Sequence, residues 1–178
     1  MTLNLKNLLN PKVKLSKMGE FQELQPIDGL QVSAVSADLY SGTSSAGRDD
    51  ITLFYFNEGA NFGAVYTNSK ITSHSINWNL KIKRHFVKGI LVTTYSANTF
   101  TGIKGAQGLK EVVQTLAKSL TLKASQSPKG LKEVVKITDI LVASTGIIGG
   151  QFPHVKIKNR IPELVKKLRI EQNKFVWF

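Results

Sequence analysis

The sequence predicts an α/β fold, in the broad sense that includes α+β arrangements, with layers of mixed β-sheet and helices packed outside. Three observations lead to this expectation. Short runs typical of strands recur irregularly along the chain, and two other segments carry apolar residues at helical spacing. The chain has 178 residues, 42% of them hydrophobic, which is enough for one independent hydrophobic core.

Strands are expected where apolar residues alternate with polar ones or run together. Residues 30–37 alternate and predict a half-buried strand, whereas 140–143 are continuously apolar and predict a buried one. A serine- and glycine-rich loop is expected at 41–50, and a turn at 57–59. The full set of expected strands is 30–37, 51–56, 64–67, 89–94 and 140–143.

Two helices are expected from a 3.6-residue apolar period. The first covers 108–120, and the second covers 161–171 with Pro162 in its first turn. The hexapeptide Gly-Leu-Lys-Glu-Val-Val occurs at 108–113 and again at 130–135. A single short repeat without a third copy does not indicate a solenoid.

The charge of the chain favours anionic partners. Its formal charge is +12, from 24 Lys and Arg against 12 Asp and Glu. Neither the stacking aromatics of an RNA-binding sheet nor a zinc finger accompanies this charge, so nucleic acid is an unlikely partner. The chain has no apolar run long enough to span a bilayer, and we expect no membrane partner.

The ends and the compartment follow from composition. Residues 1–20 are expected as a basic N-terminal segment, and 21–178 as a single α/β domain. Cysteine is absent, which excludes disulfides and thiolate catalysis and fits a cytoplasmic protein. A mitochondrial presequence would be richer in Arg and Ser, so the mitochondrial matrix is the less favoured location.

Polar and aromatic residues away from the motifs below are interpreted structurally. Asp49 and Asp50 are expected in a charged turn before a strand. The histidines, at 74, 85 and 154, lack metal-ligand spacing and are expected at the surface or in packing, so no metal or other cofactor is implied. Trp78, Trp177 and Phe178 are expected in the core or at an interface.

The most informative segment is 142–149, which reads Val-Ala-Ser-Thr-Gly-Ile-Ile-Gly. A buried strand that ends in small, hydroxylated and glycine residues can expose backbone N–H groups and a hydroxyl in a tight turn. Donors fixed in this way can stabilise a negative charge that develops during a reaction. Because many α/β domains contain such turns, a purely structural turn is the alternative.

Three segments together resemble one enzyme family. They are Gly-Ala-Val-Tyr-Thr-Asn at 63–68, the stretch 90–102 that ends in Asn-Thr-Phe-Thr-Gly, and Ala-Ser-Thr-Gly-Ile-Ile-Gly at 143–149. Their order and content resemble the ornithine acetyltransferase family, also called glutamate N-acetyltransferase. The resemblance runs from about residue 29 to 152, and only the third motif is specific.

The resemblance implies roles for individual residues. Thr145 and Gly146 match the pair that forms the oxyanion hole of that family, and the threonine hydroxyl and glycine N–H are the two donors. Substrate binding or loop shaping is implied for Ser144 and for Asn98, Thr101 and Gly102. However, Thr93–Ser96 stand where the family has Asn-Ser-Gly-Asn, and Tyr95 replaces a glycine, which favours a structural loop around Asn98.

The resemblance also implies a partner. The related enzymes are heterotetramers that cleave themselves before a threonine, which becomes the nucleophile of the β chain. That threonine lies in an Asn-Met-Ala-Thr-Met-Leu context that residues 1–178 do not contain. This chain therefore resembles an incomplete α portion, expected to be inert without its β chain, with N-acetylornithine and glutamate as substrates and acetyl-CoA as a further candidate.

Two alternatives to the enzyme remain open. In the first, the chain is a non-catalytic remnant that binds a protein partner or an anion through its basic surface, which the altered loop at 93–96 would favour. In the second, the chain binds nucleic acid.

Overall fold

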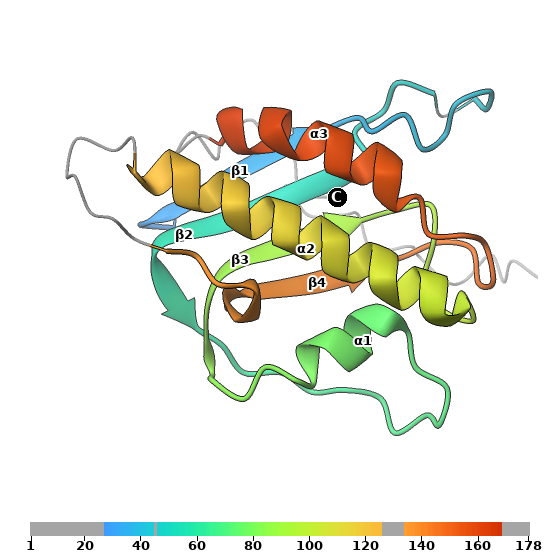
Figure 1. Cartoon of the computed structure of the whole chain (residues 1–178), viewed down its shortest axis with the longest axis horizontal. Helices are drawn as coiled ribbons and strands as arrows, with labels where there is room; N and C mark the ends of the chain where they lie inside the picture. Colours follow the sequence, from blue (N-terminus) through green and yellow to red (C-terminus); the bar gives the residue numbers. More distant parts are fainter. Residues whose placement is uncertain (1–26, 45, 126–133, 169–178) are drawn as a thin grey trace, which may run out of the picture.

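The computed structural model describes residues 27–44, 46–125 and 134–168, which form one mixed β-sheet with helices (Figure 1). The strand order is β1-β2-β3-β4, in which β1–β2 and β2–β3 are antiparallel and β3–β4 are parallel. The bounds are β1 Leu30–Val35, β2 Ile51–Asn61, α1 His74–Asn79, β3 Phe86–Thr93, α2 Gly102–Ser125, η2 Ile137–Asp139, β4 Ile140–Ser144 and α3 His154–Lys166. The expected α/β class with outer helices is confirmed.

The core lies between one face of the sheet and the helices α2 and α3, which cross that face side by side (Figure 1). Alternate strand residues such as Leu53 and Leu91 meet Leu116 of α2 and Ile161 of α3, and all four are fully buried. Each such side chain contributes roughly 1.5–3 kcal/mol by leaving water. Gly108 lets the two helices approach closely, because a Cβ there would lie 2.8 Å from the His154 ring.

Short helix α1 covers the outer edge of β4 instead of another strand. Its Asn79 side chain both donates to Val142 O and accepts from Val142 N, each at 2.9 Å. The Trp78 indole Nε1 donates to Ile140 O at 3.0 Å, which fixes the partly buried ring in place. Side chains of one helix therefore satisfy the backbone groups that an edge strand would leave unpaired.

Several sequence-based element boundaries are wrong. Residues 64–67 form no strand, and Val65 there is 99% exposed, so its apolar side chain does not pack into the core. The expected turn at 57–59 lies inside β2, which continues through an irregularity between Tyr55 and Ala60. The helix α1 was not expected, although Ser73 marks its start by accepting a hydrogen bond from Ile76 N.

Both long helices begin earlier than their apolar period indicates. Helix α2 begins at Gly102 and not at 108. Its first turn is mostly exposed, so the apolar period that predicts the helix is absent there. Helix α3 begins at His154, so Pro162 lies in its interior and not in its first turn. Proline there removes one helical hydrogen bond, which the buried face of α3 must offset.

Some expectations fall on residues outside the described part. They are the basic segment 1–20, most of the second hexapeptide copy, residues 169–171 of the expected helix, Trp177 and Phe178. Trp78 does pack against the core, as expected. Within the described ranges, no helix combines the length and apolarity needed to cross a membrane.

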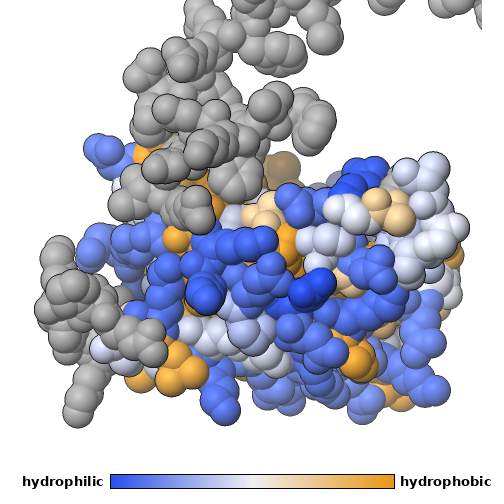
Figure 2. All heavy atoms as spheres, turned by 90° about the horizontal axis from the view of Figure 1, so that it is seen from above, coloured by the Kyte–Doolittle hydropathy of each residue, from blue (hydrophilic) through white to orange (hydrophobic). Residues whose placement is uncertain are grey.

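The surface seen in Figure 2 is mainly hydrophilic, with small, separate hydrophobic patches outside the atoms drawn in grey. This distribution agrees with the dispersed Lys and Arg residues of the chain.

Candidate active site

The candidate site lies at the edge of the sheet where the parallel strands β3 and β4 both end. The N-terminal ends of α2 and α3 lie at this same edge, on the right of Figure 1. Helix N-termini carry partial positive charge and unpaired N–H groups. The edge therefore offers a favourable environment for an anion that develops during a reaction.

The turn after β4 is hydrogen-bonded to the loop after β3 through every second of its backbone N–H groups. Thr145 N donates to Thr93 O at 3.0 Å, and Ile147 N donates to Tyr95 O at 2.9 Å. Gly149 N donates to Thr99 O at 2.8 Å. The ladder fixes the turn, and the amide of Gly146, which falls between two ladder bonds, is left out of it.

The turn also contains the two donors that the sequence indicated. Among the described residues, neither the Thr145 hydroxyl nor the Gly146 N–H has a hydrogen-bond partner, and both residues are exposed. The turn is thus held by its neighbours, while the two groups that the sequence indicated belong to exposed residues and are unpaired within the described part of the chain. A backbone N–H that is fixed and unpaired in this way can donate to an anion that develops during a reaction.

Gly146 cannot be replaced without moving the backbone. Its φ is 128°, and a Cβ would lie 2.3 Å from both C and O of Tyr95. The turn therefore rests directly on the Tyr95 peptide.

Ser144 serves to join elements. Its hydroxyl is 2.7 Å from the Ser75 hydroxyl of α1 and accepts from Thr93 Oγ1 at 3.1 Å. The end of β4 is thereby attached to both β3 and α1.

Asn98 and Thr101 shape the loop that leads into α2. Asn98 is fully buried; its Oδ1 accepts from Thr101 Oγ1 at 2.6 Å, and its Nδ2 donates to Gly105 O at 3.3 Å. Its carbonyl accepts from His74 N at 3.0 Å. Gly102 opens α2 with a φ of 62°. Both ends of the Asn98 amide are occupied inside the chain, which fits loop shaping better than contact with a substrate.

Tyr95 adopts the backbone conformation that the glycine of the resembled family would allow. Its φ is 78°, in the left-handed region that bulky residues rarely occupy. Its N–H donates to the Tyr40 hydroxyl at 3.1 Å, and the two rings meet edge to face with centroids 5.5 Å apart. The loop is therefore left-handed at Tyr95 although no glycine stands there.

The sequence predicted Asp50 in a charged surface turn, and this prediction is wrong. It is buried, and its carboxylate accepts from Ala37 N at 2.6 Å and Leu39 N at 2.8 Å. Its carbonyl accepts from Thr94 N at 3.0 Å. Asp50 thus joins the loop after β1 to the loop after β3. A carboxylate directly before an apolar strand was the only sequence signal for this role.

The histidines do not form a metal site. His154 packs against Gly108 at the crossing of α2 and α3, and His74 lies at the start of α1. Within the described part of the chain, no group of three or more His, Cys, Asp or Glu residues is arranged to hold a metal ion.

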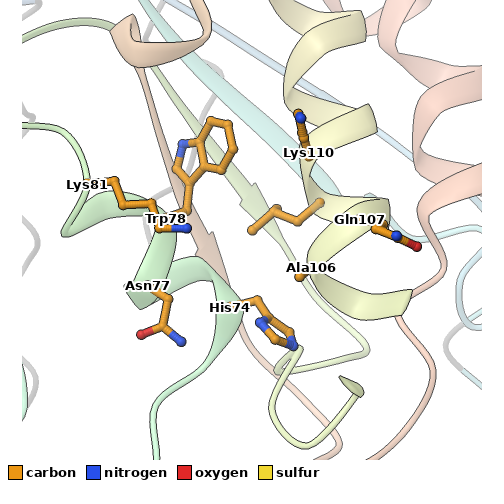
Figure 3. A pocket seen from close by; sticks show the side chains of 8 residues that line it. His74, Asn77, Trp78, Lys81, Ala106, Gln107 and Lys110 are labelled. Carbon is orange, nitrogen blue, oxygen red and sulfur yellow. The ribbon is translucent and has the colours of Figure 1, made fainter. Parts of the chain in front are cut away.

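Two hollows adjoin these elements. One, of about 380 Å³, is lined by Tyr95, Phe152 and Lys156 among others, whereas Thr145 and Gly146 are not among the described residues that line it. The other, of about 230 Å³, lies between α1 and α2 (Figure 3). Lys81 and Lys110 stand on its opposite sides, with Trp78 between the two helices.

Comparison with known proteins gives one consistent result. The model of the ArgJ family matches residues 32–176. The arginine biosynthesis bifunctional protein ArgJ of Bartonella quintana is 30% identical over 146 residues, which are 82% of this chain and 31% of that protein. The mitochondrial ArgJ protein of the fungus Arthroderma otae is 31% identical over 79% of this chain and 28% of its own length.

Solved structures show the same fold. The ornithine acetyltransferase of Mycobacterium tuberculosis, crystallised with ornithine, matches with a TM-score of 0.69 and 20% identity over 82% of this chain and 69% of that one. The ArgJ protein of Bacillus halodurans matches with a TM-score of 0.66 and 19% identity, over 80% of this chain and 65% of its own. The chain spans about a third of the length of the curated relatives named above.

Proposed function

The chain belongs to the ArgJ family, and from this premise we propose that it supplies the oxyanion hole of a glutamate N-acetyltransferase in arginine biosynthesis. Thr145 and Gly146 are the proposed donors. The nucleophile, a threonine exposed by self-cleavage, belongs to the β portion of the same precursor, and together the portions form a heterotetramer.

The proposed reaction has two halves. The threonine hydroxyl attacks the acetyl carbonyl of N-acetylornithine, the C–N bond breaks, and ornithine leaves with a proton while the acetyl group stays on the threonine. The amine of glutamate then attacks this ester and releases the threonine as N-acetylglutamate forms. In both halves, the carbonyl oxygen becomes negative and accepts hydrogen bonds from the Thr145 hydroxyl and the Gly146 N–H. Each such donor is worth on the order of 3 kcal/mol in the transition state.

The observation that carries the proposal is the pairing of the turn. Its ladder bonds fix Thr145 and Ile147 on either side of Gly146, while the Gly146 N–H and the Thr145 hydroxyl have no partner among the described residues. Because the ladder fixes the backbone on both sides of Gly146 before substrate arrives, its N–H needs little reorganisation during the reaction.

Apolar residues around these donors support a β-portion partner. Phe100 and Ile103 are 68% and 76% exposed, and Ile147 and Ile148 are 58% and 66% exposed. They belong to the two segments that the ladder joins, 93–103 and 144–149. A partner that covered them would remove apolar surface from water and would also exclude water from the reacting carbonyl.

The test measures acetyl transfer from N-acetylornithine to glutamate by the chain with its β portion supplied. We expect transfer by the assembly and none by residues 1–178 alone. Thr145→Val should lower kcat/KM on the order of 100-fold, whereas Thr115→Val, on α2 and outside the three family motifs, should leave it unchanged. Unaltered activity of Thr145→Val, or an inactive assembly, would overturn the proposal.

An alternative function is supported by the hollow between α1 and α2. Lys81 and Lys110 line it, no acidic residue does, and neither lysine is in an ion pair among the described residues (Figure 3). A non-catalytic chain could bind a small anion there. Two results together would favour this alternative: an inactive assembly, and saturable binding of phenyl phosphate to the chain. The double variant Lys81→Ala with Lys110→Ala should abolish this binding, whereas Lys118→Ala should not.

We further propose a cytoplasmic location. The absence of cysteine fits a reducing compartment. A fungal relative carries "mitochondrial" in its name, which keeps the matrix as the second choice.

A further inference from the structure

Tyr95 is held in an unfavourable backbone conformation by its surroundings. A bulky L-residue at a φ of 78° persists only where neighbouring groups determine it. The Tyr40 hydroxyl accepts the Tyr95 N–H at 3.1 Å, and the Tyr40 ring meets the Tyr95 ring edge to face. Both the backbone and the side chain of Tyr95 are thus in contact with Tyr40.

Tyr40 is itself firmly placed. Its carbonyl accepts from Thr43 N at 3.1 Å and from Thr43 Oγ1 at 2.7 Å. The Arg48 guanidinium lies over its ring, 5.3 Å from the centroid. The residue before it, Leu39, is tied to the buried Asp50 carboxylate. These contacts restrain Tyr40 from both its backbone and its ring, so it can hold Tyr95 in place.

The Tyr95 peptide in turn supports the proposed oxyanion hole. Its carbonyl accepts from Ile147 N at 2.9 Å, and Gly146 approaches so closely that no Cβ would fit between them. A rotation of the Tyr95 carbonyl would break its bond from Ile147 N and displace the Gly146 backbone that packs against it. We therefore expect the position of the Gly146 N–H to depend on the φ of Tyr95.

We propose that Tyr40 is a positioning residue for acetyl transfer, which it serves by holding Tyr95 in the left-handed conformation that aims the Gly146 N–H. The inference rests on the proposed function. Tyr40 touches neither substrate nor nucleophile in this mechanism; it acts through Tyr95.

The activity test uses Tyr40→Phe, which removes the accepting hydroxyl and keeps the ring. In the assembly with the β portion, kcat should fall about tenfold with KM nearly unchanged, because donor geometry matters most in the transition state. Tyr95→Gly in the same background should restore kcat, because glycine adopts a positive φ without support. Tyr66→Phe is the matched control, since the Tyr66 hydroxyl has no hydrogen bond among the described residues, and it should leave kcat unchanged.

A second measurement on the chain needs no activity. The Ile147 amide, which donates to Tyr95 O, should exchange its hydrogen faster in Tyr40→Phe and return to the original rate in the double variant. Unchanged kcat in Tyr40→Phe, failure of Tyr95→Gly to rescue, or unchanged exchange would each overturn the inference. An inactive unaltered assembly would overturn the proposed function instead, and amide exchange would still decide whether Tyr40 holds the turn.

Discussion

Two segments that run side by side at the edge of the sheet differ in how their polar groups are used. In the loop after β3, the Asn98 side chain is buried and bonded at both ends of its amide. In the turn after β4, Thr145 and Gly146 are exposed residues, and the Thr145 hydroxyl and the Gly146 N–H lack partners among the described residues. The Asn98 side chain stabilises the loop, whereas the turn after β4 presents unpaired donors. The resemblance to the family had implied site roles for residues of both segments.

The difference teaches how to separate these roles by experiment. Replacing a buried side chain that shapes the loop, such as Asn98, should change stability more than activity per folded molecule. Removing a side-chain group that contacts the reacting oxygen, such as the Thr145 hydroxyl, should do the reverse.

The largest loss of stability is expected for Gly146→Ala. The new Cβ would strike the Tyr95 backbone, so the turn must separate from the loop, at a cost on the order of 2–4 kcal/mol. Gly149→Ala is the matched control: its φ is 78°, but a Cβ there would meet nothing within 4 Å, and about 1 kcal/mol is expected. Urea unfolding of both variants measures the difference, and equal costs would contradict the close approach of the two backbones.

The next largest loss is expected for Asn98→Ala. The change removes the buried amide and leaves Gly105 O without its side-chain donor, which should cost about 2–3 kcal/mol. Transfer per folded molecule should stay within a few-fold of the original. Asn77→Ala, at an exposed position of α1, is the control for unfolding. A full loss of kcat with unchanged stability would place Asn98 in contact with the substrate instead.

Thr145→Val should have the opposite effect to Asn98→Ala, with a large loss of activity and little change in stability. Because the hydroxyl is exposed and unbonded among the described residues, its loss should change the free energy of unfolding by no more than about 0.5 kcal/mol. Thermal and urea unfolding measure this value beside the activity assay. A large destabilisation would mean that the hydroxyl has a structural partner after all.

The smallest effect is expected away from both segments, at the ion pair between α2 and α3. Lys158 donates to Glu111 at 2.6 Å, and its hydrogen bond and charge hold the pKa of that carboxyl below its usual value of 4.5. A lowered pKa in the folded state means that the pair stabilises the protein above the unfolded pKa and that this contribution is lost as the pH falls through the folded pKa. Glu111→Gln should slightly flatten the fall of Tm between roughly pH 5 and 3 at low salt, since screening weakens exposed pairs. An unchanged Tm profile would show that the pair contributes nothing.

The sequence predicted the parts of this edge that depend on local pattern. The apolar run before Ser144 forms the buried strand β4, and the alternation after residue 29 forms β1. The period of α2 identified its buried face but not its first turn, where exposed residues such as Ile103 show no periodic signal.

What the sequence could not predict depends on contacts between distant segments. Asp50 receives hydrogen bonds from residues more than ten positions away, and only the folded chain brings them together. Likewise, the sequence has a tyrosine at position 95 where the resembled family has a glycine. Nothing in the sequence indicated that Tyr40 would support a positive φ at this tyrosine.

Helix α1 has a consequence for how this chain behaves among its own copies. Exposed edge strands invite the strands of other molecules, a route to ordered aggregates. Because Trp78 and Asn79 occupy the outward backbone groups of Ile140 and Val142, that margin cannot accept an incoming strand while the helix stays in place. Loosening α1 would convert this margin of the sheet into a site of intermolecular strand exchange.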